Sequence, residues 1–176
     1  MKIHIGKLTA SPIGTIFVAA SQKHIISIGL VDTRSKFLAE IGKSAGELDQ
    51  TITSTDNPLI SQSLHQLKEY LDGERSVFDL PVDWSDMTGF QFNVLKETYN
   101  IPFGQVLTYG EIARRIGNPN AARAVGRVEA TNPLPILIPC HRVIGTDGKL
   151  HGYGGRGGIK TKAWLLHHEG VLLDAG

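Results

Sequence analysis

The spacing of apolar residues changes along this chain, and the change restricts the fold to one in which strands precede helices. Short runs rich in Ile and Val, separated by the turns SPIG and SQK, predict strands at residues 2–9, 15–20 and 24–30. After a connecting stretch at 83–88, apolar residues recur at helical spacing instead. A chain of 176 residues is long enough for two small lobes of this kind.

We therefore predict an α/β (α+β) fold with two domains. A small β-rich supporting domain would occupy residues 1–87, and a helical domain would occupy residues 88–176. The helical domain would begin with a helix that Thr88 caps and that runs through Tyr99.

The N-terminal domain also contains one strong helix signal. Asn57 and Pro58 form a helix start, because Asn caps exposed backbone amides and Pro suits the first helical position. Leucines follow at near-helical spacing until Gly73 ends the pattern. The polar stretch at 34–56 predicts one weak helix, and residues 76–82 predict a further strand.

A capping box lies in the middle of the helical domain. In the sequence TYGE, Thr108 and Glu111 can satisfy each other's exposed amides, which predicts a short helix at 109–116. Gly117 ends this helix, and an Asn-Pro pair starts another at 120–130. Two short helices joined by a glycine turn predict a helix-turn-helix, whose second helix is the one that contacts DNA.

Composition describes an ordinary globular protein. Apolar residues make up 41% of the chain and charged residues 20%, which is not the balance of a disordered protein. No apolar run approaches the roughly 20 residues that span a bilayer, and the N-terminus does not match a signal peptide. One cysteine cannot form an internal disulfide, so we expect a reducing, cytoplasmic location. We expect no structural metal, because cysteine ligands are lacking and these histidines are scattered: His4, His24 and His65.

Charge is distributed unevenly, although the net charge is only +1. Residues 1–87 contain 8 Lys and Arg against 11 Asp and Glu, whereas residues 88–176 contain 10 against 6. A surplus of positive charge favours contact with a polyanion. The helical domain is therefore the better candidate for binding nucleic acid, with the N-terminal domain supporting it.

The only cysteine, Cys140, lies in the segment PILIPCHRVIG, after an apolar extended run at 134–138. From the residues alone it has two interpretations. It is either a small buried core residue, or a nucleophile that needs a base or a positive field to lower the pKa of its thiol. His141 and Arg142 could supply that help, but adjacency in sequence is not contact in space. The residues that follow, RVIGTDGKL, predict a strand, a GTDG turn and a second strand.

The motif IPCHRVIG is preceded by GNPNAARAVG and NPLPILIP, and it is followed by GYGG and WLLHHEG. Together these segments, from about residue 88 to residue 170, closely resemble the O6-alkylguanine-DNA alkyltransferases, or methylated-DNA–protein-cysteine methyltransferases. The N-terminal domain resembles theirs in outline. The resemblance implies direct DNA repair by irreversible, single-turnover transfer of an alkyl group from O6-alkylguanine to Cys140, without a cofactor. O4-alkylthymine is implied as a second substrate.

The resemblance also implies a role for each residue around Cys140. His141 would polarise the thiol through a water molecule, and Glu169 would orient His141. Asn132 would link the recognition helix to the cysteine loop. The hydroxyl of Tyr109 would donate to N3 of the departing guanine.

Contacts with DNA are implied as well. Because the cysteine is buried, the damaged nucleotide has to be flipped out of the duplex, and Arg123 would fill the gap from the minor groove. Carbonyls of Cys140 and Val143 would bind the guanine amine, and amides of residues 153–155 would lie near O6. The implied DNA-binding residues are Thr108, Ala122, Arg123, Ala124, Gly126 and Arg127. The implied pocket residues are Pro139, Val143, Tyr153, Gly154 and Gly155.

Two departures from the family pattern are visible. GRVEATNP replaces small residues and an Asn near the end of the recognition helix, and Glu129 would place a negative charge near the expected phosphates. Between Tyr153 and Trp164 the chain has two residues more than the pattern, which would lengthen the loop that closes the pocket.

Three alternatives fit parts of the pattern. An alkyltransferase-like protein that binds lesions without repairing them would lack the reactive cysteine. A helix-turn-helix regulator that senses electrophiles would need a further effector domain, and a cysteine hydrolase would need a separate Asp or Asn–His pair. We therefore expect a monomer that binds double-stranded DNA and no membrane. It would be nucleoid-associated on DNA, or nuclear in a eukaryotic host.

Overall fold

The computed structural model describes residues 3–45, 51–52, 57–87 and 89–172. Thr88, the predicted helix cap, lies outside these residues. The chain forms two compact units, Met1–Asp83 and Trp84–Gly176. This division falls shortly before the boundary that the sequence placed after residue 87. In the described part of the chain, no helix has the length and apolar character needed to span a bilayer.

The N-terminal unit contains a four-stranded sheet with the strand order β3-β2-β1-β4. Its strands are β1 (Ile3–Leu8), β2 (Ile16–Ala20), β3 (Ile25–Leu30) and β4 (Thr51–Ile52). β1 pairs antiparallel with β2, with His4 opposite Ala20, and β2 pairs antiparallel with β3, whereas β4 runs parallel to β1. The three strands predicted from apolar runs are therefore confirmed.

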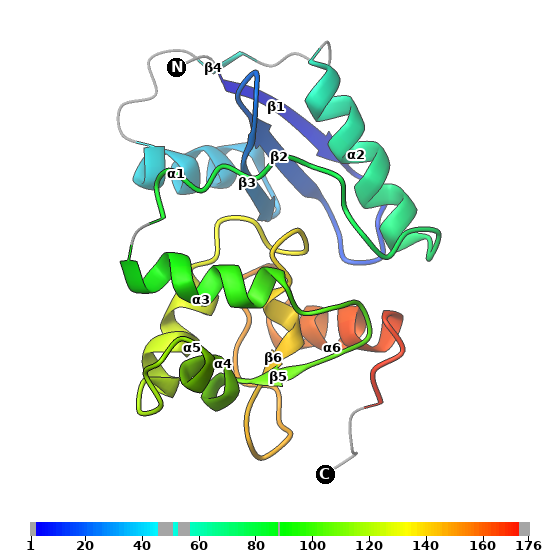
Figure 1. Ribbon diagram of the computed structural model, residues 1–176. Coiled ribbons are helices and arrows are strands. Elements are labelled where there is room, and N and C mark those ends of the chain that lie inside the picture. Colours follow the sequence, from blue (N-terminus) through cyan, green and yellow to red (C-terminus); the bar gives the residue numbers. More distant parts are fainter. Residues whose placement is uncertain (1–2, 46–50, 53–56, 88, 173–176) are drawn as a thin grey trace. The chain divides into compact units, whose positions relative to one another are not determined.

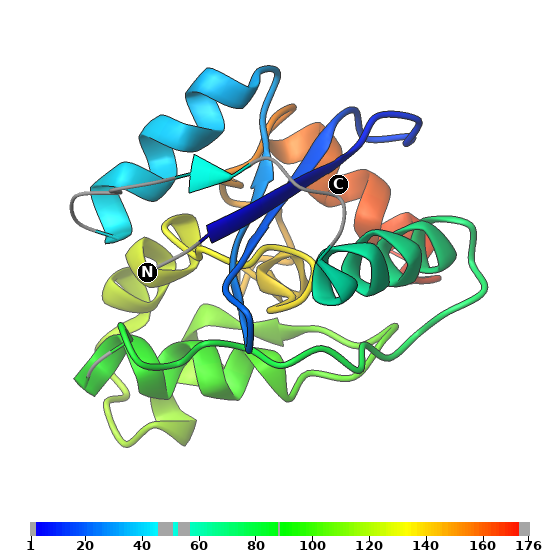
Figure 2. The ribbon, with the colours of Figure 1, turned by 90° about the horizontal axis from the view of Figure 1, so that it is seen from above.

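Two helices cover opposite faces of this sheet (Figure 2). They are α1 (Arg34–Ala45) and α2 (Pro58–Leu71). Glycines allow the close packing, because a Cβ on Gly29 would collide with the Phe37 ring of α1 and a Cβ on Gly6 would collide with Ile60 of α2. Since both faces are covered, every residue of β2 is buried.

The start of α2 agrees with its prediction. Oδ1 of Asn57 accepts hydrogen bonds from the amides of Leu59 (2.9 Å) and Ile60 (3.2 Å). Pro58 occupies the first helical position, where its missing amide hydrogen costs no hydrogen bond.

The strand predicted at 76–82 is wrong. In this segment only Val82 forms a bridge, with Ile25. Pro81 precedes it and has no amide hydrogen with which to extend a ladder. The Pro81 carbonyl does accept a hydrogen bond from the Ile25 amide (2.8 Å), so the segment is fixed to the edge of the sheet without becoming a strand.

The C-terminal unit is mainly helical (Figure 1). Its helices are α3 (Gly89–Tyr99), α4 (Tyr109–Arg115), α5 (Ala122–Ala130), the 3-10 helix η1 (Cys140–Arg142) and α6 (Ile159–His168). Two short strands, β5 (Leu107–Thr108) and β6 (Val143–Ile144), pair in parallel. The hairpin predicted after Cys140 is wrong, because β6 pairs with β5 and only a turn, closed by a bond from the Gly145 amide to the Lys149 carbonyl (3.0 Å), follows it.

The helices α4 and α5 form the predicted helix-turn-helix. Oγ1 of Thr108 accepts from the Glu111 amide (3.1 Å), and Oε2 of Glu111 accepts from the Thr108 amide (2.7 Å), so the capping box is present. Gly117 ends α4 with a φ of 77°, a conformation that costs glycine little. The unit packs through a buried cluster that contains Val94, Ile101, Ile112, Ala113, Val125 and Val143.

Candidate active site around Cys140

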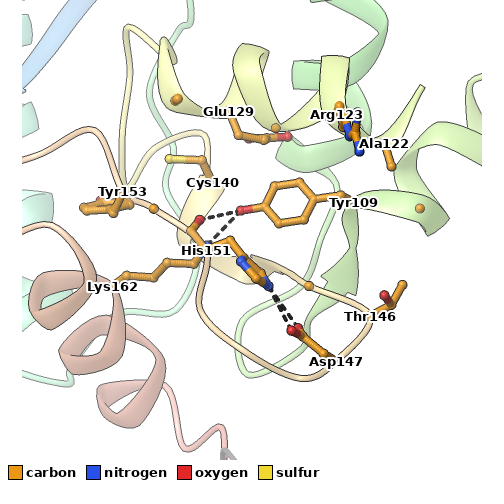
Figure 3. Close-up of a pocket in the computed structure, with 15 residues that line it drawn as sticks. Tyr109, Ala122, Arg123, Glu129, Cys140, Thr146, Asp147, His151, Tyr153 and Lys162 are labelled. Atoms are coloured by element: carbon orange, nitrogen blue, oxygen red, sulfur yellow. Dashed lines mark hydrogen bonds and ion pairs between the residues drawn. The ribbon is translucent and has the colours of Figure 1, made fainter. Parts of the chain in front are cut away.

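A cavity of about 700 Å³ in the C-terminal unit reaches Cys140 (Figure 3). Its wall comes from α4, α5, η1, α6 and the loop that follows β6. Among the predicted site residues it brings together Tyr109, Ala122, Arg123, Gly126, Cys140 and Tyr153. Within the described residues, no group of three or more His, Cys, Asp or Glu side chains is arranged to hold a metal ion.

Cys140 begins η1 and is only 5% exposed. Asn132 fixes the loop before it, since its Nδ2 donates to the Ile138 carbonyl (2.8 Å) and its Oδ1 accepts from the Leu134 amide (3.0 Å). Ile136 in this loop has a φ of 73°, which is strained for a β-branched residue. The end of α5 is thus joined by hydrogen bonds to the strained loop that positions the cysteine.

The thiol of Cys140 does not ionise readily in this environment. Burial, and after it the carboxyl of Glu129, raise the pKa of the thiol to about 12, while Asn132 and the charge of Lys162 act in the opposite direction. The resting side chain is therefore a protonated thiol near neutral pH. Any reaction in which it is a nucleophile requires removal of that proton.

Next to Cys140 along the chain lies a buried network of charged side chains. His141 Nε2 and Glu169 Oε1 are 2.7 Å apart. Arg142 donates to the same carboxyl, from Nε to Oε2 (2.8 Å) and from Nη2 to Oε1 (2.9 Å). Burial opposes the charge on Glu169, but the bonds from His141 and Arg142 outweigh it and hold the pKa of this carboxyl well below its usual range. Glu169 is therefore ionised, and Nε2 of His141 carries the hydrogen between them.

This assignment leaves Nδ1 of His141 with its lone pair. Nδ1 is buried and has no hydrogen-bond partner among the described residues. Burial lowers the pKa of His141, and the nearby charges of Arg142 and Lys162 add to the effect, although Glu169 opposes it. The ring is consequently neutral, and a neutral imidazole with a free nitrogen can accept a proton.

Lys162 is a residue of the cavity wall that no sequence motif predicted. This side chain is 1% exposed, and its Nζ donates to the Val143 carbonyl (2.6 Å) and to the Tyr109 hydroxyl (3.3 Å). Burial lowers its pKa, against the pull of Cys140 and Glu129. One sequence signal was available, because residues seven apart lie on the same helical face and Glu169 follows Lys162 by seven.

The hydroxyl of Tyr109 already has a partner in the loop after β6. Its Oη donates to the His151 carbonyl (2.8 Å), as Figure 3 shows. Burial, with smaller contributions from Glu129 and Cys140, raises the pKa of Tyr109 to about 12. The hydroxyl is therefore a neutral donor in the wall of the cavity.

The predicted DNA-contacting residues divide into two groups. Arg123 and Arg127 are exposed one helical turn apart on α5. Ala122 and Gly126 line the cavity with Arg123, and a Cβ on Gly126 would meet the Tyr109 ring at an ordinary contact distance of 3.7 Å. The other three predicted residues are outside the lining, namely Thr108, Ala124 and Arg127.

Of the predicted pocket residues, only Tyr153 lines the cavity. Gly154 packs on the end of α5, since a Cβ there would lie 2.6 Å from the Ala130 carbonyl oxygen. The carbonyl of Gly155 accepts from the Gly158 amide (3.1 Å), and that of Pro139 accepts from the Arg142 amide (2.8 Å). These three residues and Val143 lie outside the cavity lining.

The expectation for Glu129 is wrong. Its side chain does not lie at the DNA-facing surface but is 6% exposed, and Thr98 Oγ1 donates to its Oε1 (2.5 Å). The reason is the helical register of α5, because Glu129 follows buried Val125 by four residues and so lies on the same inward face. The carboxyl instead forms part of the cavity wall with Cys140.

The fold and the site define an α+β class of protein in which a helix-turn-helix adjoins a buried cysteine. Residues 89–171 match the DNA-binding domain of 6-O-methylguanine DNA methyltransferase, and residues 5–84 match the ribonuclease-like domain of the same protein family. The chain therefore belongs to the 6-O-methylguanine DNA methyltransferase family.

Individual relatives agree with this membership. The methylated-DNA–protein-cysteine methyltransferase of Mycobacterium tuberculosis is 42% identical over 159 residues, which cover 90% of this chain and 88% of that protein. The Shigella flexneri protein of that name is 47% identical over 108 residues, so the match covers 61% of this chain and less than two thirds (62%) of that relative. The crystal structure of M. tuberculosis OGT in complex with DNA has a TM-score of 0.77 at 34% identity and covers 96% of this chain and 92% of that chain.

Proposed function

We propose that this chain repairs DNA directly, by moving an alkyl group from O6 of guanine to Sγ of Cys140. One observation carries the proposal: the only cysteine lies in the wall of a cavity, and the next residue along the chain is a neutral histidine that a buried carboxylate orients. Family membership supports it, and the relative whose structure contains DNA supports DNA as the partner.

The reaction balances without a cofactor. The bond between O6 and the alkyl carbon breaks while the bond between that carbon and Sγ forms, and the electron pair of the broken bond goes to O6. The proton lost by the thiol is matched by one gained by the guanine. The thioether that results is stable, so each molecule reacts once.

The proton path begins at the thiol. Nδ1 of His141 accepts the proton of Cys140 through a water molecule, and the carboxylate of Glu169 stabilises the imidazolium that forms. The positive charge of Lys162 favours the thiolate of Cys140 and so offsets part of the cost of burying that negative charge. The guanine that leaves receives a hydrogen bond at N3 from the Tyr109 hydroxyl. To donate this bond, the hydroxyl gives up its hydrogen bond to the His151 carbonyl.

DNA is bound through α5 in the minor groove. The target guanine is flipped into the cavity, at a cost of a few kcal/mol for unstacking, and Arg123 at the cavity rim fills the gap in the duplex. O4-alkylthymine presents the same alkyl–oxygen bond and is a second substrate. The protein acts as a monomer in the compartment that holds chromosomal DNA, which is the cytoplasm in a bacterial host and the nucleus in a eukaryotic one.

The test is incubation with a duplex that contains O6-methylguanine, followed by mass spectrometry of the peptide that carries Cys140. We expect this peptide to gain the mass of one methylene, and we expect no gain in Cys140→Ser, which serves as the control. A protein that binds the lesion duplex without any gain in mass would instead be a lesion-binding protein, and the proposal would be wrong.

A further inference from the structure

One oxygen of the cavity wall is unexplained by the reaction above. Glu129 has two carboxyl oxygens, and only Oε1 has a partner, the hydroxyl of Thr98. Oε2 is buried and has no hydrogen-bond partner among the described residues. Buried polar atoms are paired in the great majority of cases, so an unpaired oxygen in a cavity wall indicates a partner that the cavity receives.

The position of Glu129 restricts what that partner can be. Its side chain lies beside Cys140 and above the Tyr109 ring in Figure 3, and its charge would act on both of these groups. The alkyl group has to be in contact with Sγ of Cys140 when it is transferred. Because Glu129 and Cys140 line the same cavity, the wall that Glu129 forms is one that a substituent beyond the reacting carbon can approach.

The titratable groups that face Glu129 are Cys140 from η1, Tyr109 from α4 and Lys162 from α6. Burial raises the pKa of Glu129 to about 8, while the bond from Thr98 and the charge of Lys162 act to lower it. At neutral pH the side chain is mainly a carboxylic acid. In that form Oε2 can donate a hydrogen bond as well as accept one.

We propose that Glu129 determines which alkyl groups this chain removes, by hydrogen-bonding through Oε2 to a polar substituent on the group being transferred. The proposal rests on the proposed function, since it concerns the cavity in which Cys140 is alkylated. It predicts a preference for adducts that carry a hydroxyl on the second carbon over adducts of equal size that carry a methyl there.

Two substrates of matched size test this preference. Duplexes with O6-(2-hydroxyethyl)guanine and with O6-propylguanine differ by a hydroxyl in place of a methyl group. The measurement is the ratio of their second-order transfer rates to Cys140, taken within each protein so that changes in overall rate cancel. In the wild-type protein we expect a ratio of about ten in favour of hydroxyethyl, the value of one ordinary buried hydrogen bond.

Three variants locate the effect. In Glu129→Leu the ratio should fall to about one or below, whereas Glu129→Gln, which keeps an acceptor and donors but cannot ionise, should retain most of it. Glu97→Leu is the matched control and should leave the ratio unchanged, because Glu97 pairs with Arg115 on a partly exposed surface (3.8 Å) and is absent from the cavity lining.

Glu129→Leu is expected to fold. Thr98 Oγ1 also contacts the Val94 carbonyl (3.0 Å), so its hydroxyl keeps an acceptor when the carboxyl is removed. A melting curve for each variant checks this point. Equal ratios in the wild-type protein and Glu129→Leu would overturn the proposal. Failure of the wild-type protein to accept even a methyl group would instead overturn the proposed function.

Discussion

Nε2 of His141 lies 2.7 Å from Oε1 of Glu169, and both side chains are fully buried. The bond directs Nδ1 away from the carboxylate and leaves it free to accept a proton. Arg142 donates to the same carboxylate, so the negative charge of Glu169 balances the positive charge of Arg142. His141, the proposed proton acceptor, thus belongs to a buried charged network, and we expect this network to stabilise the C-terminal unit.

Glu169→Gln should destabilise the protein by about 3 to 5 kcal/mol, because removing one partner of a buried ion pair leaves the charge of Arg142 uncompensated. Urea denaturation measures the loss. Glu97→Gln is the control, since it removes only the partly exposed pair with Arg115 and should cost about 1 kcal/mol or less. A loss as small as that of the control would mean that Glu169 does not hold this network together.

Glu129 makes folding stability depend on pH in a direction opposite to the usual carboxylate. Its pKa is about 8 in the folded protein and about 4.3 when unfolded. Between these values the folded state keeps a proton that the unfolded state has released, so the contribution of Glu129 to stability is complete below about pH 4 and is lost as pH rises to about 8. We expect Glu129→Gln to lack this decrease, as measured by urea denaturation across that range. Parallel pH profiles for the two proteins would show that the carboxyl is ionised in the fold.

Because Glu129 lies inside the fold, Glu129→Gln should leave affinity for undamaged duplex unchanged at low salt. Phosphate contacts dominate that affinity, and a buried carboxyl that keeps its proton opposes them little. Fluorescence anisotropy with labelled DNA gives the measurement. Tighter binding by the variant would place the carboxylate near the phosphates after all.

Arg123→Ala should weaken binding to a lesion in duplex DNA by no more than a few kcal/mol, the unstacking cost of one base. Single-stranded substrate has no stack to fill, so its binding should change much less. Arg127→Ala, one turn further along α5, should affect both substrates alike through phosphate charge. If Arg123→Ala also affects both alike, Arg123 acts only as a charge.

Asn132→Ala should destabilise the protein by about 1 to 3 kcal/mol and slow alkyl transfer, since it leaves the Ile138 carbonyl and the Leu134 amide without their side-chain partner. Asn118→Ala is the control, because the side chain of Asn118 donates to the Ile116 carbonyl at an exposed site (3.2 Å), and the backbone bonds of Asn118 remain in the variant. Equal stability of the two variants would mean that the cysteine loop keeps its conformation without Asn132.

Much of the fold could be predicted because its signals are local. Asn57-Pro58 and the Thr108–Glu111 capping box involve neighbouring residues, so the sequence alone contains both partners. The strand at 76–82 failed because strand formation depends on a distant partner and on amide hydrogens that Pro81 lacks. The pairing of β6 with β5 also joins residues that are distant in sequence, and the local GTDG turn does not determine it.

The site residues also divide into those that local sequence motifs identify and those that only contacts in the fold identify. Cys140 and Arg123 lie in sequence motifs, and the family resemblance already paired Glu169 with His141. The bond from Arg142 to Glu169 and the contacts of Lys162 join residues that are distant in sequence, and they became visible only in the fold. Glu129 could have been placed by its spacing from Val125. Acidic side chains are rarely buried unless they are paired. For that reason the sequence favoured an exposed position for Glu129.

The central claim is that Cys140 accepts one alkyl group and keeps it. The most direct measurement is the amount of labelled methyl bound to protein after reaction with excess O6-methylguanine duplex. We predict one methyl group per molecule, retained on Cys140 and absent from Cys140→Ser. Transfer of many methyl groups per molecule, or release of the label into solution, would contradict the account.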